Sequence, residues 1–309
     1  MRPTALIYSS HDRSEYLHRW WIVERALQSH TNKTLLHLPF SQRTRHGQEY
    51  DYNNFRWYYD RYAQWGLAYC PFYWSDNLSR EDVDLFFHML WHSEVVVLGG
   101  GSSSLGLARY KAIGEMYYGD RELFSRILHE RQQRGLLTVG FSAGADQLCQ
   151  YLCEVGSKPV SDPYGFSLAR NVLTTLHHEP GREGEIWHLA GNLPHCMVFG
   201  LPNDSGIAAH QFRLWSGNTF QMIWFVTDNS WDVPHHQHHI KTRHGVKIEH
   251  IYNDGRHWSF NGGDVMVRII SPDGKWQDIT IITNDGRFVD YWSQGPSEYW
   301  SIQQIIDSN

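Results

Sequence analysis

The pentapeptide Gly140-Phe141-Ser142-Ala143-Gly144 places a serine between small residues. A short apolar run, residues 136–139, precedes it and a segment of helical character follows it. This is the G-x-S-x-G pattern of a nucleophile elbow, in which small neighbours permit a sharp, strained strand-to-helix turn that exposes the serine hydroxyl. The pattern therefore predicts Ser142 as a nucleophile for acyl transfer.

A second glycine-rich turn, Gly99-Gly100-Gly101, follows the apolar run Val95–Leu98. Ligands of parallel α/β sheets bind outside the carboxyl ends of the strands, so both turns are expected at one sheet edge. The backbone N–H groups near Gly100, Gly101 and Ala143 are candidates for an oxyanion hole, because glycine allows close approach. Tight turns without function or a phosphate cradle are the alternatives, but the lysine of a phosphate loop is missing.

A serine hydroxyl needs a base, since it is a poor nucleophile at neutral pH. The segment Leu176-His177-His178-Glu179 supplies two imidazoles downstream of Ser142. We predict His177 as the base and keep His178 as the alternative. The chain contains 20 histidines, so this choice rests on position relative to the family pattern described below.

Strand-like and helix-like segments alternate over the first 155 residues. The expected strands are residues 4–9, 33–39, 67–73, 94–98 and 136–141. The expected helices are residues 14–29, 53–65, 79–92 and 104–134, the last of them split near Gly119-Asp120. Such alternation predicts βαβ units and a parallel sheet with helices on both faces.

The character of the sequence changes after about residue 185. The expected strands there are residues 221–227, 246–252, 264–270 and 276–283, separated by Asp-Gly and Asn-Gly turns. We therefore predict an α/β hydrolytic unit over residues 1–211 and a mainly β extension over residues 212–309 that packs on it.

Composition excludes several classes of protein. The net charge is −6 and no basic block is present, which argues against a nucleic-acid surface. No apolar run approaches the ~20 residues that span a bilayer, and the N-terminus lacks the pattern of a signal peptide. Four cysteines show no paired spacing of a disulfide framework or zinc ribbon. A cytoplasmic protein without membrane or nucleic-acid partners is expected.

Histidines gather in the predicted extension, in His235-His236-Gln237-His238-His239 and at His244, His250 and His257. Neutral imidazoles ligate zinc, nickel or copper, so a metal site is one interpretation. A surface loop is the other, and we favour it because no cysteine and no helical H-x₃-H with a glutamate accompany the cluster. No metal is expected.

Over about residues 1–210 the chain resembles peptidase family S51, which includes aspartyl dipeptidase and cyanophycinase. The shared features are a Gly triplet after a strand, a G-x-S-A-G-A turn, and a histidine about 35–42 residues after the serine. Further similar segments follow the serine, namely Gly165–Leu168, Arg182–Ile186 for an R-E-x-x-I pattern, and Gly200–Asp204 for a G-L-P-E-G turn.

The resemblance implies a flavodoxin-like, class I glutamine amidotransferase-like sheet and serine-dependent hydrolysis of a peptide substrate, without any cofactor. It also implies that Arg182, with His178 beside it, binds substrate. A guanidinium suits the acidic side chain of an N-terminal aspartate because it can donate two parallel hydrogen bonds. An ion pair of Arg182 with Glu179 or Glu185 is the alternative.

The sequence departs from the family at two positions. The family aspartate fifteen residues after the serine is replaced by Ser157, so Glu154 or Asp162 is expected to orient the imidazole. The glutamate of the G-L-P-E-G turn is replaced within Asn203-Asp204. A weakly active or inactive binding protein and an esterase with the same elbow therefore remain alternatives. The exact substrate and the formation of a homodimer are left open.

Overall fold

The computed structural model describes residues 1–10, 15–156, 161–227 and 246–309. The parallel strands of its large sheet are β1 (Ala5–Tyr8), β2 (Thr34–Leu38), β3 (Ala68–Pro71), β4 (Val95–Leu98) and β5 (Leu137–Phe141). They lie side by side in the order β3-β2-β4-β5-β1. Each strand ends within two residues of the predicted limits.

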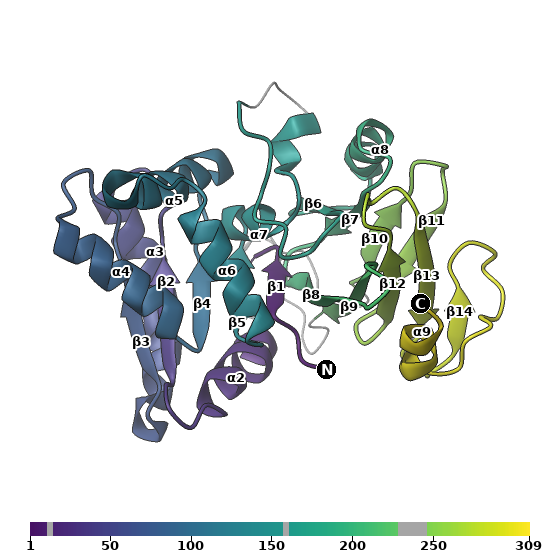
Figure 1. Ribbon diagram of the computed structural model, residues 1–309, viewed down its shortest axis with the longest axis horizontal. Coiled ribbons are helices and arrows are strands. Elements are labelled where there is room, and N and C mark those ends of the chain that lie inside the picture. Colours follow the sequence, from purple (N-terminus) through teal and green to yellow (C-terminus); the bar gives the residue numbers. More distant parts are fainter. Residues whose placement is uncertain (11–14, 157–160, 228–245) are drawn as a thin grey trace.

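Helices cover both faces of this parallel part (Figure 1). One face carries α4 (Arg80–His92), α5 (Ser103–Tyr118) and α6 (Leu123–Gln133); the other carries α1 (Glu15–Leu17), η1 (His18–Val23), α2 (Glu24–Leu27) and α3 (Arg45–Tyr59). Successive strand residues point to opposite faces. Leu36 and Val96 accordingly pack under α4–α6, whereas Leu35 and Val95 pack under η1, α2 and α3. The predicted α/β architecture is confirmed.

The helix predictions differ from the structure at two places, and one of them is His18–Val23, which forms the π helix η1 inside the helix expected at residues 14–29. The helix expected at residues 53–65 begins earlier, at Arg45, because the Thr44 side chain accepts a hydrogen bond from the Gly47 N–H and caps it. Residues Asp60–Trp65 form the 3₁₀ helix η2 instead of its end. The predicted split of residues 104–134 is confirmed, since α5 ends at Gly119 with φ 63° and α6 starts at Leu123.

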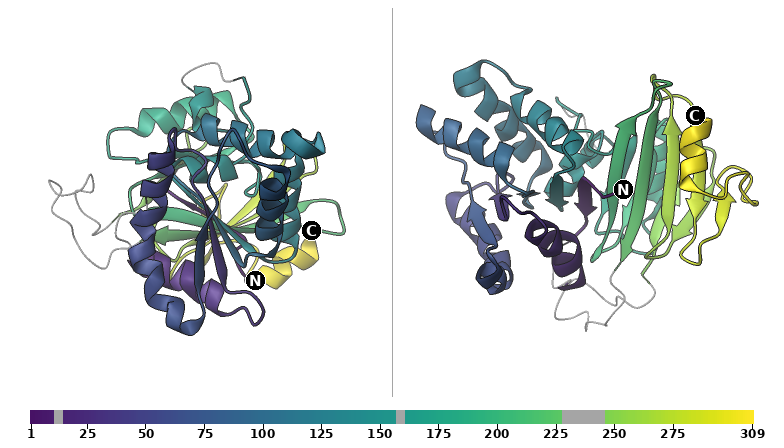
Figure 2. Two further views of the ribbon diagram at one scale, coloured as in Figure 1. Left: turned by 90° about the vertical axis from the view of Figure 1, so that its left-hand side faces the viewer. Right: turned by 60° about the horizontal axis from the view of Figure 1, so that its bottom comes forward.

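The C-terminal strands continue the same sheet. They are β8 (Ser205–Arg213), β9 (Thr219–Thr227), β12 (Val265–Ile270), β13 (Gln277–Ile282) and β14 (Phe288–Asp290), added in that order as antiparallel neighbours beyond β1. Figure 2 shows them as one broad surface beside the helical part. Sequence analysis missed β8, whose only β-branched residue is Ile207. The predicted boundary between the α/β unit and the β extension, at residues 211 and 212, falls inside β8. The division of the chain into these two units stays a prediction.

A second, four-stranded sheet has the order β11-β10-β7-β6. Its strands are β6 (Val172–Leu176), β7 (Met197–Leu201), β10 (Ile248–Ile251) and β11 (His257–Phe260). One face packs on the large sheet, where the rings of Phe225 and Phe260 stack with centroids 3.8 Å apart. The helix α8 (Glu183–Asn192) covers its other face, and α9 (Ile302–Ser308) packs on the large sheet. The small sheet therefore fixes the residues that follow β6 and β7.

His250, in β10, is fully buried between the sheets. Its Nδ1 donates to the Val198 carbonyl at 2.7 Å, which leaves Nε2 to accept from the Tyr291 hydroxyl at 2.8 Å. Burial is the main cause that lowers the pKa of His250 to about 3. The imidazole is therefore neutral in the folded protein at every physiological pH.

This buried imidazole predicts a loss of stability in acid. Between about pH 6.5 and about pH 3, His250 binds a proton in the unfolded chain but stays neutral in the folded chain. We expect the free energy of unfolding, relative to that of a His250→Gln variant, to fall by about 1.4 kcal/mol per pH unit in this window. Urea unfolding of both proteins at stepped pH measures the difference, and parallel pH profiles would contradict the prediction.

Candidate active site

Ser142 stands at a sharp turn between β5 and α7 (Ala143–Leu148), with φ 49° and ψ −113°. A non-glycine residue in such a conformation carries about 1–3 kcal/mol of strain. The flanking glycines are sterically required. A Cβ atom on Gly140 would lie 2.2 Å from the Gly144 oxygen, and one on Gly144 would lie 2.1 Å from the Leu98 oxygen. The predicted strand, strained serine and helix are thus all present.

The imidazole of His177 faces this serine. Its Nε2 lies 3.3 Å from the Ser142 Oγ, which is within reach for proton transfer. The histidine backbone is held on both sides, because its N–H donates to Ser9 Oγ at 2.8 Å and its carbonyl accepts from Arg182 Nη1 at 2.8 Å. The structure therefore brings together the serine and the first-choice histidine of the sequence analysis.

Asn203 holds the other side of the imidazole. Its Oδ1 lies 2.6 Å from His177 Nδ1. An amide oxygen only accepts, so this hydrogen bond assigns the proton to Nδ1 and leaves Nε2 free to accept from Ser142. The two residues meet because β6 and β7 are parallel with Leu176 opposite Leu201, so their carboxyl ends lie together.

Sequence reasoning did not assign this role to Asn203. The predicted partner was a carboxylate near the family aspartate position, whereas Asn203 stands in the G-L-P-E-G-like turn, where the family glutamate is replaced. That substitution was the available signal. A residue where the family carries an acid was a candidate partner for the imidazole.

The carboxylates expected at this position lie elsewhere. Asp162 forms an ion pair with Lys111. Glu154 lies in the 3₁₀ helix η3 (Cys153–Gly156). Neither reaches the ring of His177, whose two nitrogens face Ser142 and Asn203. Ser157, at the family aspartate position, lies outside the described residues.

The alternative base, His178, points into the protein and is 3% exposed. Neither ring nitrogen has a hydrogen-bond partner among the described residues. Burial is the main cause that lowers the pKa of His178. Its ring packs against Gly200, where an added Cβ atom would come within 2.8 Å. No contact joins His178 to Ser142 in the described part of the chain.

Arg182 is exposed, and its guanidinium is already engaged. It pairs with the carboxylate of Glu185 through two hydrogen bonds of 2.9 and 2.8 Å. The same guanidinium donates to the His177 carbonyl. The ion-pair interpretation thus describes the geometry of the protein as it stands, and a substrate carboxylate would have to compete with Glu185.

The glycine turn after β4 lies beside the serine. A Cβ atom on Gly100 would be 3.6 Å from the Ser142 Cβ. Among the described residues, no backbone carbonyl accepts a hydrogen bond from the N–H groups of Gly100, Gly101 or Ala143. These donors are available next to the nucleophile, as an oxyanion hole requires.

Comparisons with known proteins show similarity to peptidases. No protein-family model matches the chain. Peptidase E of Salmonella paratyphi A is 29% identical over 126 residues, which cover 37% of this chain and 51% of that protein. Peptidase E of Salmonella typhi is likewise 29% identical over 126 residues. The chain thus spans about half the length of the curated relatives that it matches.

A solved structure extends the similarity beyond that segment. The crystal structure of a peptidase from an acI-B1 Actinobacterium aligns with a TM-score of 0.55, covering 84% of this chain and 98% of that one at 14% identity. This chain is peptidase S51-like. At so low an identity the structural match concerns the fold alone.

The S51-like chain offers no metal cluster within the described residues. His257 pairs with Glu249 at 2.5 Å, and both ring nitrogens of His250 bind protein groups. The histidines at positions 235–239 and 244 lie outside the described residues. Burial raises the pKa of the Cys149 and Cys153 thiols, so neither supplies a thiolate near Ser142. In the described part of the chain, every helix is too short or too polar to cross a bilayer.

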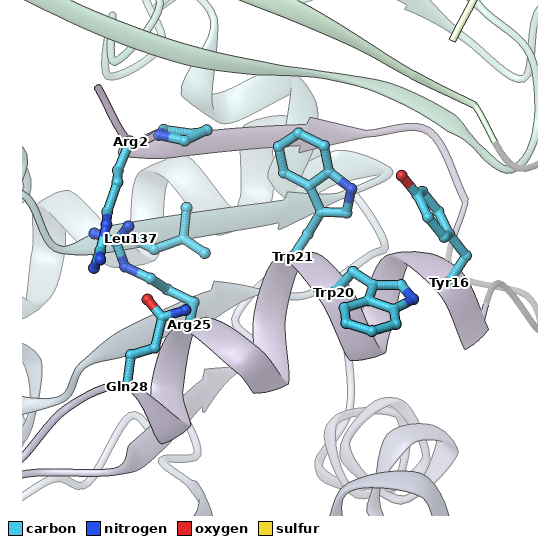
Figure 3. A pocket seen from close by; sticks show the side chains of 8 residues that line it. Arg2, Tyr16, Trp20, Trp21, Arg25, Gln28 and Leu137 are labelled. Atoms are coloured by element: carbon cyan, nitrogen blue, oxygen red, sulfur yellow. The ribbon is translucent and has the colours of Figure 1, made fainter. Parts of the chain in front are cut away.

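A hollow of about 460 Å³ lies at the opposite end of the parallel strands (Figure 3). Its lining includes aromatic and basic side chains, among them Arg2, Tyr16, Trp20, Trp21 and Arg25. Leu137, which also lines it, is the first residue of β5, so at about 3.3 Å per residue the hollow is more than 10 Å from Ser142. It is not part of the S51-like site.

Proposed function

We propose that this protein is a serine peptidase of the S51 type, which hydrolyses short or acidic peptides through an acyl-enzyme on Ser142. The observation that carries the proposal is the 3.3 Å contact between Ser142 Oγ and His177 Nε2, made at a strained turn and oriented by Asn203. The similarity to peptidase E supports a peptide as the substrate.

In the proposed reaction, His177 takes the hydroxyl proton as Ser142 Oγ attacks the peptide carbonyl. The backbone N–H groups of Gly100, Gly101 and Ala143 stabilise the negative oxygen of the tetrahedral intermediate. The C–N bond then breaks, and His177 gives its proton to the leaving amine. Water, deprotonated by His177, attacks the acyl-enzyme and releases the acid and Ser142.

One observation favours a slow enzyme or a peptide-binding protein as the second candidate. The partner of His177 Nδ1 is the neutral amide of Asn203. An amide fixes the imidazole tautomer, but it stabilises the imidazolium that forms during proton transfer less than a carboxylate does. Turnover below that of enzymes with a carboxylate at this place is therefore part of the proposal.

A fluorophosphonate probe tests the proposal, because it reacts covalently only with an activated serine. We expect the wild-type protein to be labelled at one residue and the Ser142→Ala variant not to be labelled. A Ser216→Ala variant, changed at an exposed turn serine, is the matched control and should be labelled like wild type. Absence of labelling in folded wild-type protein would favour the binding protein. Cleavage of Asp-X dipeptides and longer peptides then defines the substrate.

A further inference from the structure

Gln42 reaches the glycine turn from the neighbouring strand end. Its side-chain Nε2 donates to the Gly100 carbonyl at 2.9 Å. The two segments lie together because β2 and β4 are parallel, with Leu38 opposite Leu98. We propose that Gln42 is a positioning residue of the oxyanion hole, which fixes the Gly100–Gly101 peptide so that the Gly101 N–H faces the reacting carbonyl. This inference rests on the proposed function.

The geometry of a peptide unit explains how this hydrogen bond orients the Gly101 N–H. In a planar trans peptide, the C=O of one residue and the N–H of the next point in opposite directions. A hydrogen bond that holds the Gly100 carbonyl toward Gln42 therefore directs the Gly101 N–H away from Gln42. Without that bond, two consecutive glycines can rotate their shared peptide at little steric cost.

The segment that carries Gln42 is itself fixed. Arg109 Nη1 donates to the Phe40 carbonyl at 2.8 Å and also to the Gln42 carbonyl. The Ser41 carbonyl accepts from the Ser102 N–H at 2.9 Å, directly beyond the glycine turn. The backbone from which the Gln42 side chain reaches Gly100 is therefore held in place.

The atoms around the glycine turn leave no room for a side chain at Gly99 or Gly101. A Cβ atom on Gly101 would lie 2.3 Å from the Ser41 oxygen, and one on Gly99 would lie 2.0 Å from Asp51 Oδ2. Asp51 in turn pairs with His37 at 2.7 Å beneath the turn. The orientation of the Gly100–Gly101 peptide therefore depends on a donor from outside the turn.

A substitution that keeps the volume and removes the donor tests this role. We expect Gln42→Leu to lower kcat about 10- to 100-fold, less than the 10²–10³-fold loss on removing an oxyanion donor itself. KM and the pH midpoint of the rate should stay within about twofold and about 0.2 pH units, because His177 is untouched. Gln64→Leu, the same change at an exposed glutamine, should leave kcat unchanged.

A second measurement does not depend on activity. With glycine labelled by ¹⁵N, the Gly101 amide resonance should shift in Gln42→Leu, while glycines far from the turn should not. An unmoved Gly101 resonance, or an unchanged kcat in an active wild-type background, would overturn the role of Gln42. If the wild-type protein is inactive and the Gly101 resonance still shifts in Gln42→Leu, the proposed function fails, but Gln42 still fixes the Gly100–Gly101 peptide.

Discussion

Replacing His177 by alanine is expected to lower kcat/KM for peptide substrates about 10⁴-fold or more. The imidazole is the one base within reach of Ser142 Oγ in the described structure, at 3.3 Å. Without it the hydroxyl keeps its proton and attacks poorly, and the leaving amine has no acid to protonate it. The residual rate would come from the oxyanion hole and from substrate binding.

Steady-state kinetics and the rate of fluorophosphonate labelling measure this loss, and both should fall together. The exposed side chain of His177 allows added imidazole to enter the space it leaves, so partial rescue by imidazole is expected. His188→Ala, at an exposed histidine of α8, is the matched control. A His177→Ala variant that keeps more than a tenth of the wild-type kcat/KM would rule out its role as the base.

Two substitutions of Asn203 should change the catalytic rate in opposite directions, because one removes the acceptor for His177 Nδ1 and the other charges it. Asn203→Leu removes the acceptor at 2.6 Å from His177 Nδ1 and frees the ring to adopt the other tautomer. We expect kcat/KM to fall about 10²- to 10³-fold, since orienting partners of a catalytic histidine contribute on this scale or above. Asn203→Asp keeps the acceptor and adds a negative charge, so we expect kcat to rise about tenfold.

The pH profile separates these effects from simple loss of folding. A carboxylate beside the ring favours the charged imidazolium, so more alkaline conditions are needed to free the base. The midpoint of the acid limb of kcat/KM should therefore move upward by about one pH unit in Asn203→Asp. Thermal unfolding of both variants serves as the control. An Asn203→Leu enzyme with wild-type kinetics would show that the Nδ1 contact has no catalytic role.

Local sequence patterns were sufficient to predict the strands and helices of the parallel part of the fold. Short apolar runs such as Val95–Leu98 indicate buried strands, and the longer helical segments between them indicate helices on both faces of a parallel sheet. The serine turn was equally local, because Gly140 and Gly144 leave no room for side chains against the Gly144 and Leu98 carbonyls. These constraints act between residues close in the sequence or directly at strand ends.

Among the C-terminal strands, β8 could not be predicted from local sequence patterns. Strand β8 contains few β-branched residues, and it pairs along its whole length with β9 and at Gly206–Ala209 with β1, about 200 residues earlier. Nothing local indicates that these strands would extend the parallel sheet. Hydrogen bonds to the strands on both sides, β9 and β1, supply the stabilisation that residue preference lacks.

By itself, the sequence predicted Ser142 as the nucleophile, because small residues flank it in a local turn pattern, and His177 as the base, from its position relative to the family pattern. Only the tertiary structure decided that Asn203 orients the ring and that Gln42 holds the glycine turn. Both depend on the register of parallel strands, β6 with β7 and β2 with β4, which are separated in the sequence by whole helices. Side chains brought together by such pairing leave no periodic pattern along the chain.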